Sequence, residues 1–238
     1  MKTSQKIAVL LSLGAALATQ AAAAFESLKF DPENQLPDFP ASLVARGITS
    51  GTAVIAIRVS PEGKITDWLV LGYTQELLAR ACVDTVKNWR FTPARQDGEA
   101  VPLQTELTFD FTVEGAVVTT NVADKFLFDR FDKMGEKRMV YRPCRPGELD
   151  RQPVAVTAPS PKYALQAEQQ GVRGRVVVHF YIDETGAVRL PSVYPGPHPY
   201  LMEQAVEAVR TWKFEPPVSR GTPVLVAVTQ EFDFSPDK

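Results

Sequence analysis

The feature that most constrains this chain is an internal repeat with a constant offset of 123 residues. At this offset residues 51–111 align with residues 174–234 without a gap, and fifteen of these 61 positions are identical. Nearly all the identical residues are glycine, aromatic or aliphatic, the types that form turns and fill cores. A repeat that keeps its register over a domain length predicts two copies of one folding module.

Each copy begins with the pattern of an antiparallel hairpin. Residues 52–59 (TAVIAIRV) and 175–182 (RVVVHFYI) are rich in branched side chains and alternate as strands do. The turns SPEG and DETG that follow both end in glycine, which adopts a positive φ at little cost. Residues 65–71 and 188–194 are the returning strands. Pro191 in the second of these predicts an edge position, because proline cannot donate to a ladder.

A helix and a final strand complete each copy. Residues 74–89 carry apolar side chains at helical spacing, and Thr74 is the expected N-cap. The second helix is expected to begin at Pro199, because proline suits the first helical turn. Residues 101–111 and 224–234 alternate apolar and polar side chains, so one face of each final strand is expected to line a core.

The helices end in a repeated motif of Trp, a basic residue, Phe, any residue and Pro. A Trp in the last turn can cover the sheet with a large apolar surface, and the proline prevents the helix from continuing. The motif therefore predicts a structural corner that closes each core and carries no chemistry of its own. The corner residues are Trp89, Phe91, Pro93, Trp212, Phe214 and Pro216.

Residues 1–24 have the pattern of a secretory signal peptide. Lys2 and Lys6 flank the start, residues 7–18 are apolar, and small residues precede an expected cleavage after Ala24. A membrane-spanning helix usually needs about 20 apolar residues, and this run is shorter. We expect export with cleavage near Ala24, and an uncleaved membrane anchor is the alternative.

Taken together, these motifs resemble the TonB C-terminal domain family. The order G-x-V-x-V-x-F-x-I-D-x-x-G, W-[KR]-F-x-P, G-x-P-V and F-x-F is similar to that family's, over about residues 37–112 and 159–235. The resemblance implies an α+β fold with two tandem modules, each a three-stranded antiparallel sheet with two helices packed on one face. The expected divisions are the signal peptide 1–24, a first module 25–112, a connector 113–158 and a second module 159–238.

The resemblance also implies a function. In energy-transducing members of the family the final strand is a free sheet edge, and an extended peptide from an outer-membrane transporter pairs with it. We therefore expect a periplasmic adaptor or accessory protein that binds an outer-membrane transporter or another periplasmic protein by β-strand addition. The expected binding residues face outward on the last strand of the second module: Leu225, Ala227, Thr229 and Glu231. The equivalent strand of the first module runs directly into the connector, which can shield it.

Two other functions are left open by the sequence. One is a structural envelope protein whose modules pair with each other or with a second chain. The other is an energy transducer, if residues 1–24 are not cleaved. The doubled module and the lack of a long Pro-rich spacer favour the adaptor over the transducer.

The connector is expected to contain one helix, because apolar residues share a helical face in its first half. These residues are Val122, Phe126, Leu127, Phe131 and Met134. Cys82 lies on the apolar stripe of residues 74–89 and is expected to be a core residue. Cys144 lies in the connector, and a Cys82–Cys144 disulfide is the less favoured alternative.

Several classes of site are not supported by the sequence. It carries no nucleophile, phosphate-loop or zinc-protease motif, and His179 and His198 have no neighbours at ligand spacing. The formal net charge of −2 does not favour nucleic acid as a partner. We therefore expect no catalytic residue, no metal and no cofactor, and a protein as the partner, with self-association possible.

Overall fold

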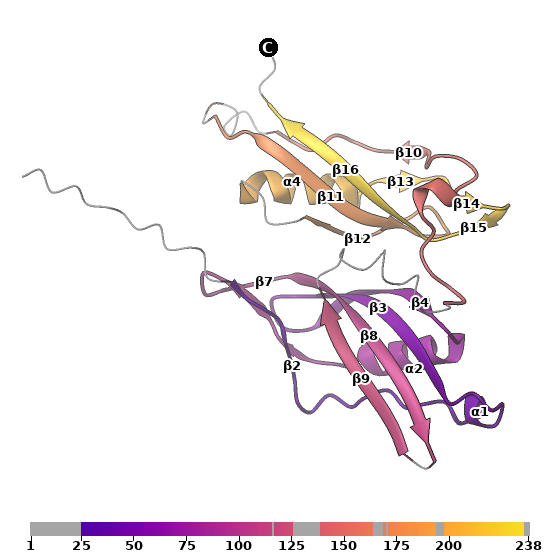
Figure 1. Cartoon of the computed structure of the whole chain (residues 1–238). Coiled ribbons are helices and arrows are strands. Elements are labelled where there is room, and N and C mark those ends of the chain that lie inside the picture. The colour runs from indigo at the N-terminus through magenta and orange to yellow at the C-terminus, as the bar shows by residue number, and fades with distance from the viewer. Residues whose placement is uncertain are drawn as a thin grey trace, which may run out of the picture.

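The computed structural model describes residues 25–115, 117–125, 139–163, 169, 171–193 and 198–235. These residues form two α+β units that follow one another along the chain (Figure 1). Each unit has its own antiparallel sheet and its own cluster of buried apolar side chains. The predicted α+β class is therefore confirmed.

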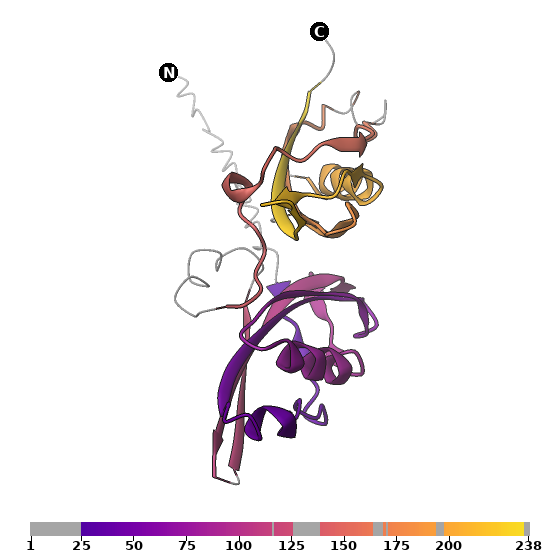
Figure 2. The ribbon, with the colours of Figure 1, turned by 90° about the vertical axis from the view of Figure 1, so that its right-hand side faces the viewer.

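The first unit is built on a four-stranded sheet in the order β4–β3–β8–β9, with its helices on one face (Figure 2). The main elements are β3 (Ser50–Val59), β4 (Ile65–Tyr73), β8 (Leu103–Glu114), β9 (Val117–Lys125), α1 (Ala41–Val44) and α2 (Glu76–Val86). Shorter strands are β1 (Phe25–Glu26), β2 (Lys29–Phe30), β5 (Phe91–Thr92), β6 (Ala94–Gln96) and β7 (Glu99–Val101).

The second unit has a three-stranded sheet in the order β12–β11–β16. Its main elements are β11 (Gly174–Ile182), β12 (Val188–Val193), β16 (Val226–Phe234) and α4 (Pro199–Arg210). Shorter elements are the 3-10 helix η2 (Pro146–Glu148), β10 (Ala155–Thr157), β13 (Lys213–Phe214), β14 (Val218–Ser219) and β15 (Thr222–Pro223). The family resemblance implies another helix in this unit, beginning near residue 164, and residues 164–168 and 170 lie outside the described residues.

Two local predictions in the second unit are confirmed. Helix α4 begins at Pro199, and the strand that contains Pro191 is an edge strand. In the first unit the predicted N-cap is wrong, because Gln75 and not Thr74 precedes α2. The hydroxyl of Thr74 instead accepts a hydrogen bond from the backbone N–H of Thr52 in β3, at 2.9 Å.

The helix predicted in the connector is also wrong where the structure describes it. Residues 117–125, including Val122, form strand β9, while residues 126–138 lie outside the described residues. Gly115, at φ +63°, lies in the turn between β8 and β9. Valine and threonine are frequent in β9, and both favour strands. The first sheet therefore has four strands where three were expected, and it extends past the predicted boundary at residue 112.

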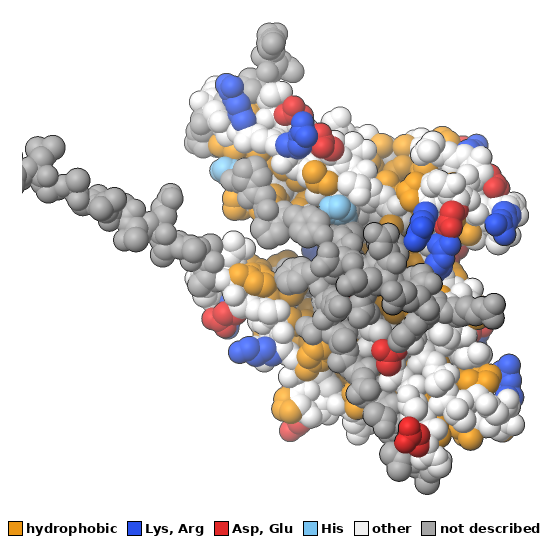
Figure 3. Space-filling model, viewed as in Figure 1, with side chains coloured by type: hydrophobic (Ala, Val, Ile, Leu, Met, Phe, Trp, Pro, Cys, Tyr) orange, Lys and Arg blue, Asp and Glu red, His pale blue; other side chains and the backbone are white. Residues whose placement is uncertain are grey.

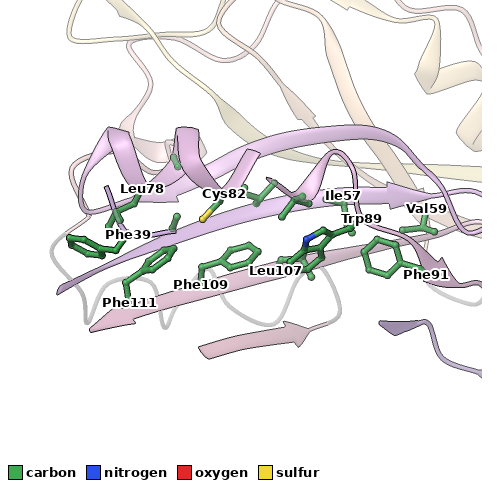
Figure 4. Close-up of a cluster of buried hydrophobic side chains, with 14 of the residues drawn as sticks. Phe39, Ile57, Val59, Leu78, Cys82, Trp89, Phe91, Leu107, Phe109 and Phe111 are labelled. Carbon is green, nitrogen blue, oxygen red and sulfur yellow. The ribbon is translucent and has the colours of Figure 1, made fainter. Parts of the chain in front are cut away.

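The core of the first unit lies between α2 and the sheet (Figure 4). Cys82 is fully buried in it, as predicted for a core residue, and burial raises the pKa of its thiol. Cys144 is also a free thiol and lies beside β16 of the second unit. The alternative of a Cys82–Cys144 disulfide is therefore wrong.

The Trp corner has the same construction in both units. The indole N–H of Trp89 donates to the carbonyl of Gln35 at 2.7 Å, and that of Trp212 donates to the carbonyl of Pro159 at 2.9 Å. Both rings are buried, with 5% and 8% of their surface exposed. Each corner therefore buries an aromatic ring and satisfies its polar group on the segment that leads into the unit.

A glycine–phenylalanine contact fixes the other side of each corner. The N–H of Phe91 donates to Gly63 at 3.0 Å, and the N–H of Phe214 donates to Gly186 at 2.9 Å. Gly63 and Gly186 have φ of +74° and +86°, and a Cβ on either would lie 2.0 Å from the facing phenylalanine carbonyl oxygen. Only glycine fits, which explains why this residue is identical in the two copies.

The two units share a third apolar cluster between them. It joins one face of the first sheet to the β12 side of the second unit, and its buried members are Val54, Ala56, Leu69, Leu71, Tyr181, Leu190 and Leu225. Leu190 has a φ of +48°, a backbone conformation that is costly for a residue with a side chain, and only 1% of it is exposed. The packing of Leu190 against the first unit compensates for this strain.

Polar contacts surround this interface. Arg189 donates to the carboxylate of Asp67 at 2.5 Å, and Gln104 donates from its side-chain nitrogen to the carbonyl of Pro191 at 2.8 Å. The hydroxyl of Tyr181 lies 3.4 Å from a carboxylate oxygen of Glu106, and burial raises the pKa of Tyr181 so that it stays a neutral donor. The two units are therefore packed together through specific apolar and polar contacts.

Replacing Gly63 with alanine should destabilise the protein by more than the ~1–2 kcal/mol that a left-handed backbone costs an ordinary residue. The added Cβ also collides with the carbonyl of Phe91. Gly98→Ala is the matched control, because Gly98 has a φ of +84° but no atom within 4 Å of a Cβ. Urea denaturation of both variants measures the difference. Equal losses would show that the Gly63–Phe91 contact does not matter.

Leu190→Ala should lower the free energy of unfolding by about 2–5 kcal/mol, the range for truncating a buried leucine. Val156→Ala is the control, because Val156 is 66% exposed in the same unit. Chemical denaturation followed by tryptophan fluorescence measures both. A loss at Leu190 no larger than that at Val156 would mean that the interface contributes little.

Candidate protein-binding edge

The outer edge of β16 is the candidate site. On one side β16 pairs with β11 without a register shift, from Ile182↔Val226 to Gly174↔Phe234. On the other side, the described part of the chain supplies a single isolated bridge, between Cys144 and Val226. Beyond that bridge, β16 has no described strand beside it. An uncovered strand presents backbone donors and acceptors that can pair with another chain.

The backbone groups on this edge can be assigned by alternation. The N–H of Cys144 donates to the carbonyl of Leu225 at 2.7 Å, so the backbone groups of Leu225 point to the outer side. Successive residues of a strand turn these groups to opposite sides. Ala227, Thr229, Glu231 and Asp233 therefore direct their N–H and C=O groups outward.

Two of the four predicted binding residues, Thr229 and Glu231, are exposed on this edge. Ala227 is half-buried and packs against the apolar cluster between the units. The Thr229 hydroxyl lies 3.2 Å from Nδ1 of His179, and Glu231 forms an ion pair with Arg175 at 3.1 Å. Burial lowers the pKa of His179 and so favours its neutral ring. The accessible edge is therefore polar on its outward face.

Leu225 is a correction to the predicted set. It faces away from the core of its own sheet, as the alternation predicts, but only 1% of its surface is exposed. The first unit covers it, through the shared cluster that contains Leu71 and Tyr181. Leu225 therefore belongs to the interface between the units, and its side chain is not available to a partner.

Three further residues at this row were not predicted from the sequence. Asp233 is exposed and continues the outward row, while His179 and Arg175 on β11 contact that row. Asp233 and Arg175 are register partners between β16 and β11. The period of two in both strands could have placed Asp233 and Arg175 on one face.

A short strap, residues 139–149, covers the beginning of β16. Tyr141 stacks on Tyr73 of the first unit, with 5.3 Å between ring centroids, and its hydroxyl donates to Glu184 of the second unit at 2.6 Å. Within the strap, a hydrogen bond from Arg142 lowers the pKa of Glu148 to about 2. The strap therefore contacts both units, and the open part of the edge starts after Val226.

The equivalent edge of the first unit is closed. Strand β9 pairs with β8 from Glu106↔Lys125 to Glu114↔Val117, without a register shift. The expectation that the connector shields this strand is confirmed. Of the two equivalent edges, the one in the second unit is open along most of its described length.

Three further observations concern other kinds of site. In Figure 3 acidic and basic side chains are scattered over the face that is seen, without one large patch of either sign. Among the described residues, no group of three His, Cys, Asp or Glu side chains could hold a metal ion. None of the helices in those residues has the length and apolar character to cross a bilayer.

Comparison with known proteins agrees with the repeat. The family model for the Gram-negative bacterial TonB protein C-terminal matches twice, over residues 35–113 and 159–236. The solution NMR structure of the Pseudomonas aeruginosa TonB CTD is 30% identical, covering 37% of this chain and 91% of that one, with a TM-score of 0.33. No curated protein matches. Since the family matches cover well over half of the chain, this protein belongs to the TonB C-terminal domain family and carries that domain twice in tandem.

Proposed function

We propose that this protein is exported to the periplasm, where it serves as an adaptor or accessory protein in outer-membrane transport. In this proposal an extended segment of a partner protein adds to the outer edge of β16. The observation that carries the proposal is the row of outward backbone groups at Thr229, Glu231 and Asp233, beside which no described strand lies. Within this row the side chain of Gln230 donates to the carbonyl of Glu231 at 2.8 Å. Strand addition needs such a row, because backbone hydrogen bonds supply much of the affinity.

Family membership supports the class of partner. TonB C-terminal domains interact with outer-membrane transporters and other envelope proteins. A transporter segment or another periplasmic protein is therefore the partner that we propose for β16. The two units pack through a common apolar cluster, and Leu225, directly before β16, is one of its buried members.

Thr229→Pro should weaken partner binding by about tenfold or more, because proline removes an outward N–H and its ring obstructs the approaching strand. Thr229→Ala is the matched control, since it removes the contact with His179 and keeps the backbone donor. The tagged chain would be mixed with outer-membrane extract, and captured proteins would be identified by mass spectrometry. The melting temperature of each variant would be recorded in parallel.

We expect the parent and Thr229→Ala to capture a transporter and Thr229→Pro to lose it while still folded. Equal capture by a folded Thr229→Pro variant would contradict the proposed edge. Sedimentation of the purified chain gives a further outcome. If the edge binds only a second copy of the chain, the parent self-associates, captures no transporter, and the structural alternative is favoured.

A further inference from the structure

Strand β8 of the first unit is the counterpart of β16. The central strand pairs Gly51 with Phe111 in the first unit and Gly174 with Phe234 in the second, and these pairs are related by the repeat offset. The outer edge of β8 is therefore the same kind of edge as the one proposed to bind a partner. By the same alternation, Glu106 and Thr108 direct their backbone groups toward that edge.

Strand β9 occupies this edge but lies outside the repeated domain. The first family match ends at residue 113, and β9 spans Val117–Lys125. The second unit has no described strand in the equivalent position. The repeated domain therefore forms this sheet edge without β9. Strand β9 comes from the connector.

We propose that β9 is a built-in strand ligand, and that the edge of β8 is a second docking site that the chain itself occupies. This inference rests on the proposed function, since it assigns the same binding mode to the equivalent edge. The two tandem domains then differ in the accessibility of this sheet edge. The second domain presents the edge of β16 to partners, and the edge of β8 in the first domain becomes available only when β9 leaves.

The sequence of β9 gives the chemistry of the segment that this edge accepts. It reads VVTTNVADK, an extended segment rich in β-branched residues with a lysine at its end. Lys125 is the register partner of Glu106, which is 4% exposed, and Asn121 is the register partner of Asp110. The occupant is therefore a β-branched extended peptide with a basic residue in register with Glu106.

A pair of proline substitutions can separate the roles of neighbouring β9 residues. Asn121 pairs with Asp110, whose backbone groups face β9, so the N–H of Asn121 faces β8. The N–H of Val122 faces the opposite side. Asn121→Pro should therefore release β9, while Val122→Pro is the matched control that leaves the pairing donors in place.

The experiment uses the full chain carrying Thr229→Pro, which blocks the edge of β16, and a synthetic peptide of residues 117–125 as the probe. Calorimetric titration measures the number of peptides bound. We expect one peptide to bind when Asn121→Pro is added and none when Val122→Pro is added. A folded Asn121→Pro variant that binds no peptide would overturn the proposal.

A second variant covers the case in which Asn121→Pro does not fold. Residues 117–125 are replaced by a Gly/Ser linker of the same length, and the melting temperature is measured with increasing peptide. A folded first unit that the peptide stabilises supports a ligand role for β9. A first unit that fails to fold and is not rescued by the peptide makes β9 an integral strand and overturns the proposal. The effect of Thr229→Pro on transporter capture is a separate measurement, so the two proposals can fail independently.

Discussion

The contact between the hairpin glycine and the phenylalanine after the helix is the constraint on which each unit depends. It ties the turn between the first two strands to the chain that leaves the helix, at Gly63–Phe91 and Gly186–Phe214. Because the helix exit is fixed there, the final strand returns beside the central strand, β8 beside β3 in the first unit and β16 beside β11 in the second. In the second unit this final strand is the outer strand of the described sheet.

The two final strands, β8 and β16, have different outer neighbours, because different segments of the chain lie beside them. In the first unit the chain turns at Gly115 and adds β9. In the second unit the strap reaches only the beginning of β16, through Cys144. The opposite edge strand of that sheet, β12, contributes Leu190 and Pro191 to contacts with the first unit. One edge therefore remains uncovered along most of its described length.

Features encoded within one repeat could be predicted from the sequence. The offset of 123 residues, the corner tryptophans and the edge position of Pro191 each have a local signature in turn, apolar or proline residues. Family membership followed from the same motifs. The corner motif was identified correctly as structural, and the structure adds that the indole N–H groups are satisfied by Gln35 and Pro159.

Features that depend on contacts between distant segments could not be predicted. Val122 fitted a helical face with later aromatic residues, but the free edge of β8 offers hydrogen bonds along the whole segment, and tertiary pairing overrides a weak periodicity. Leu225 faces away from its own core, and only the packing of the two units buries it. Thr74 has the side chain of an N-cap, but its hydroxyl is engaged by Thr52 of the neighbouring strand.

The central claim is that one of two equivalent edges is open and the other is occupied. Backbone hydrogen exchange of the free protein, resolved to single amides, tests it most directly. The outward amides of Thr229, Glu231 and Asp233 should exchange rapidly, and the equivalent amides of Glu106, Thr108 and Asp110 should be protected by β9. Slow exchange at both edges would show that β16 is covered as well and would contradict the account.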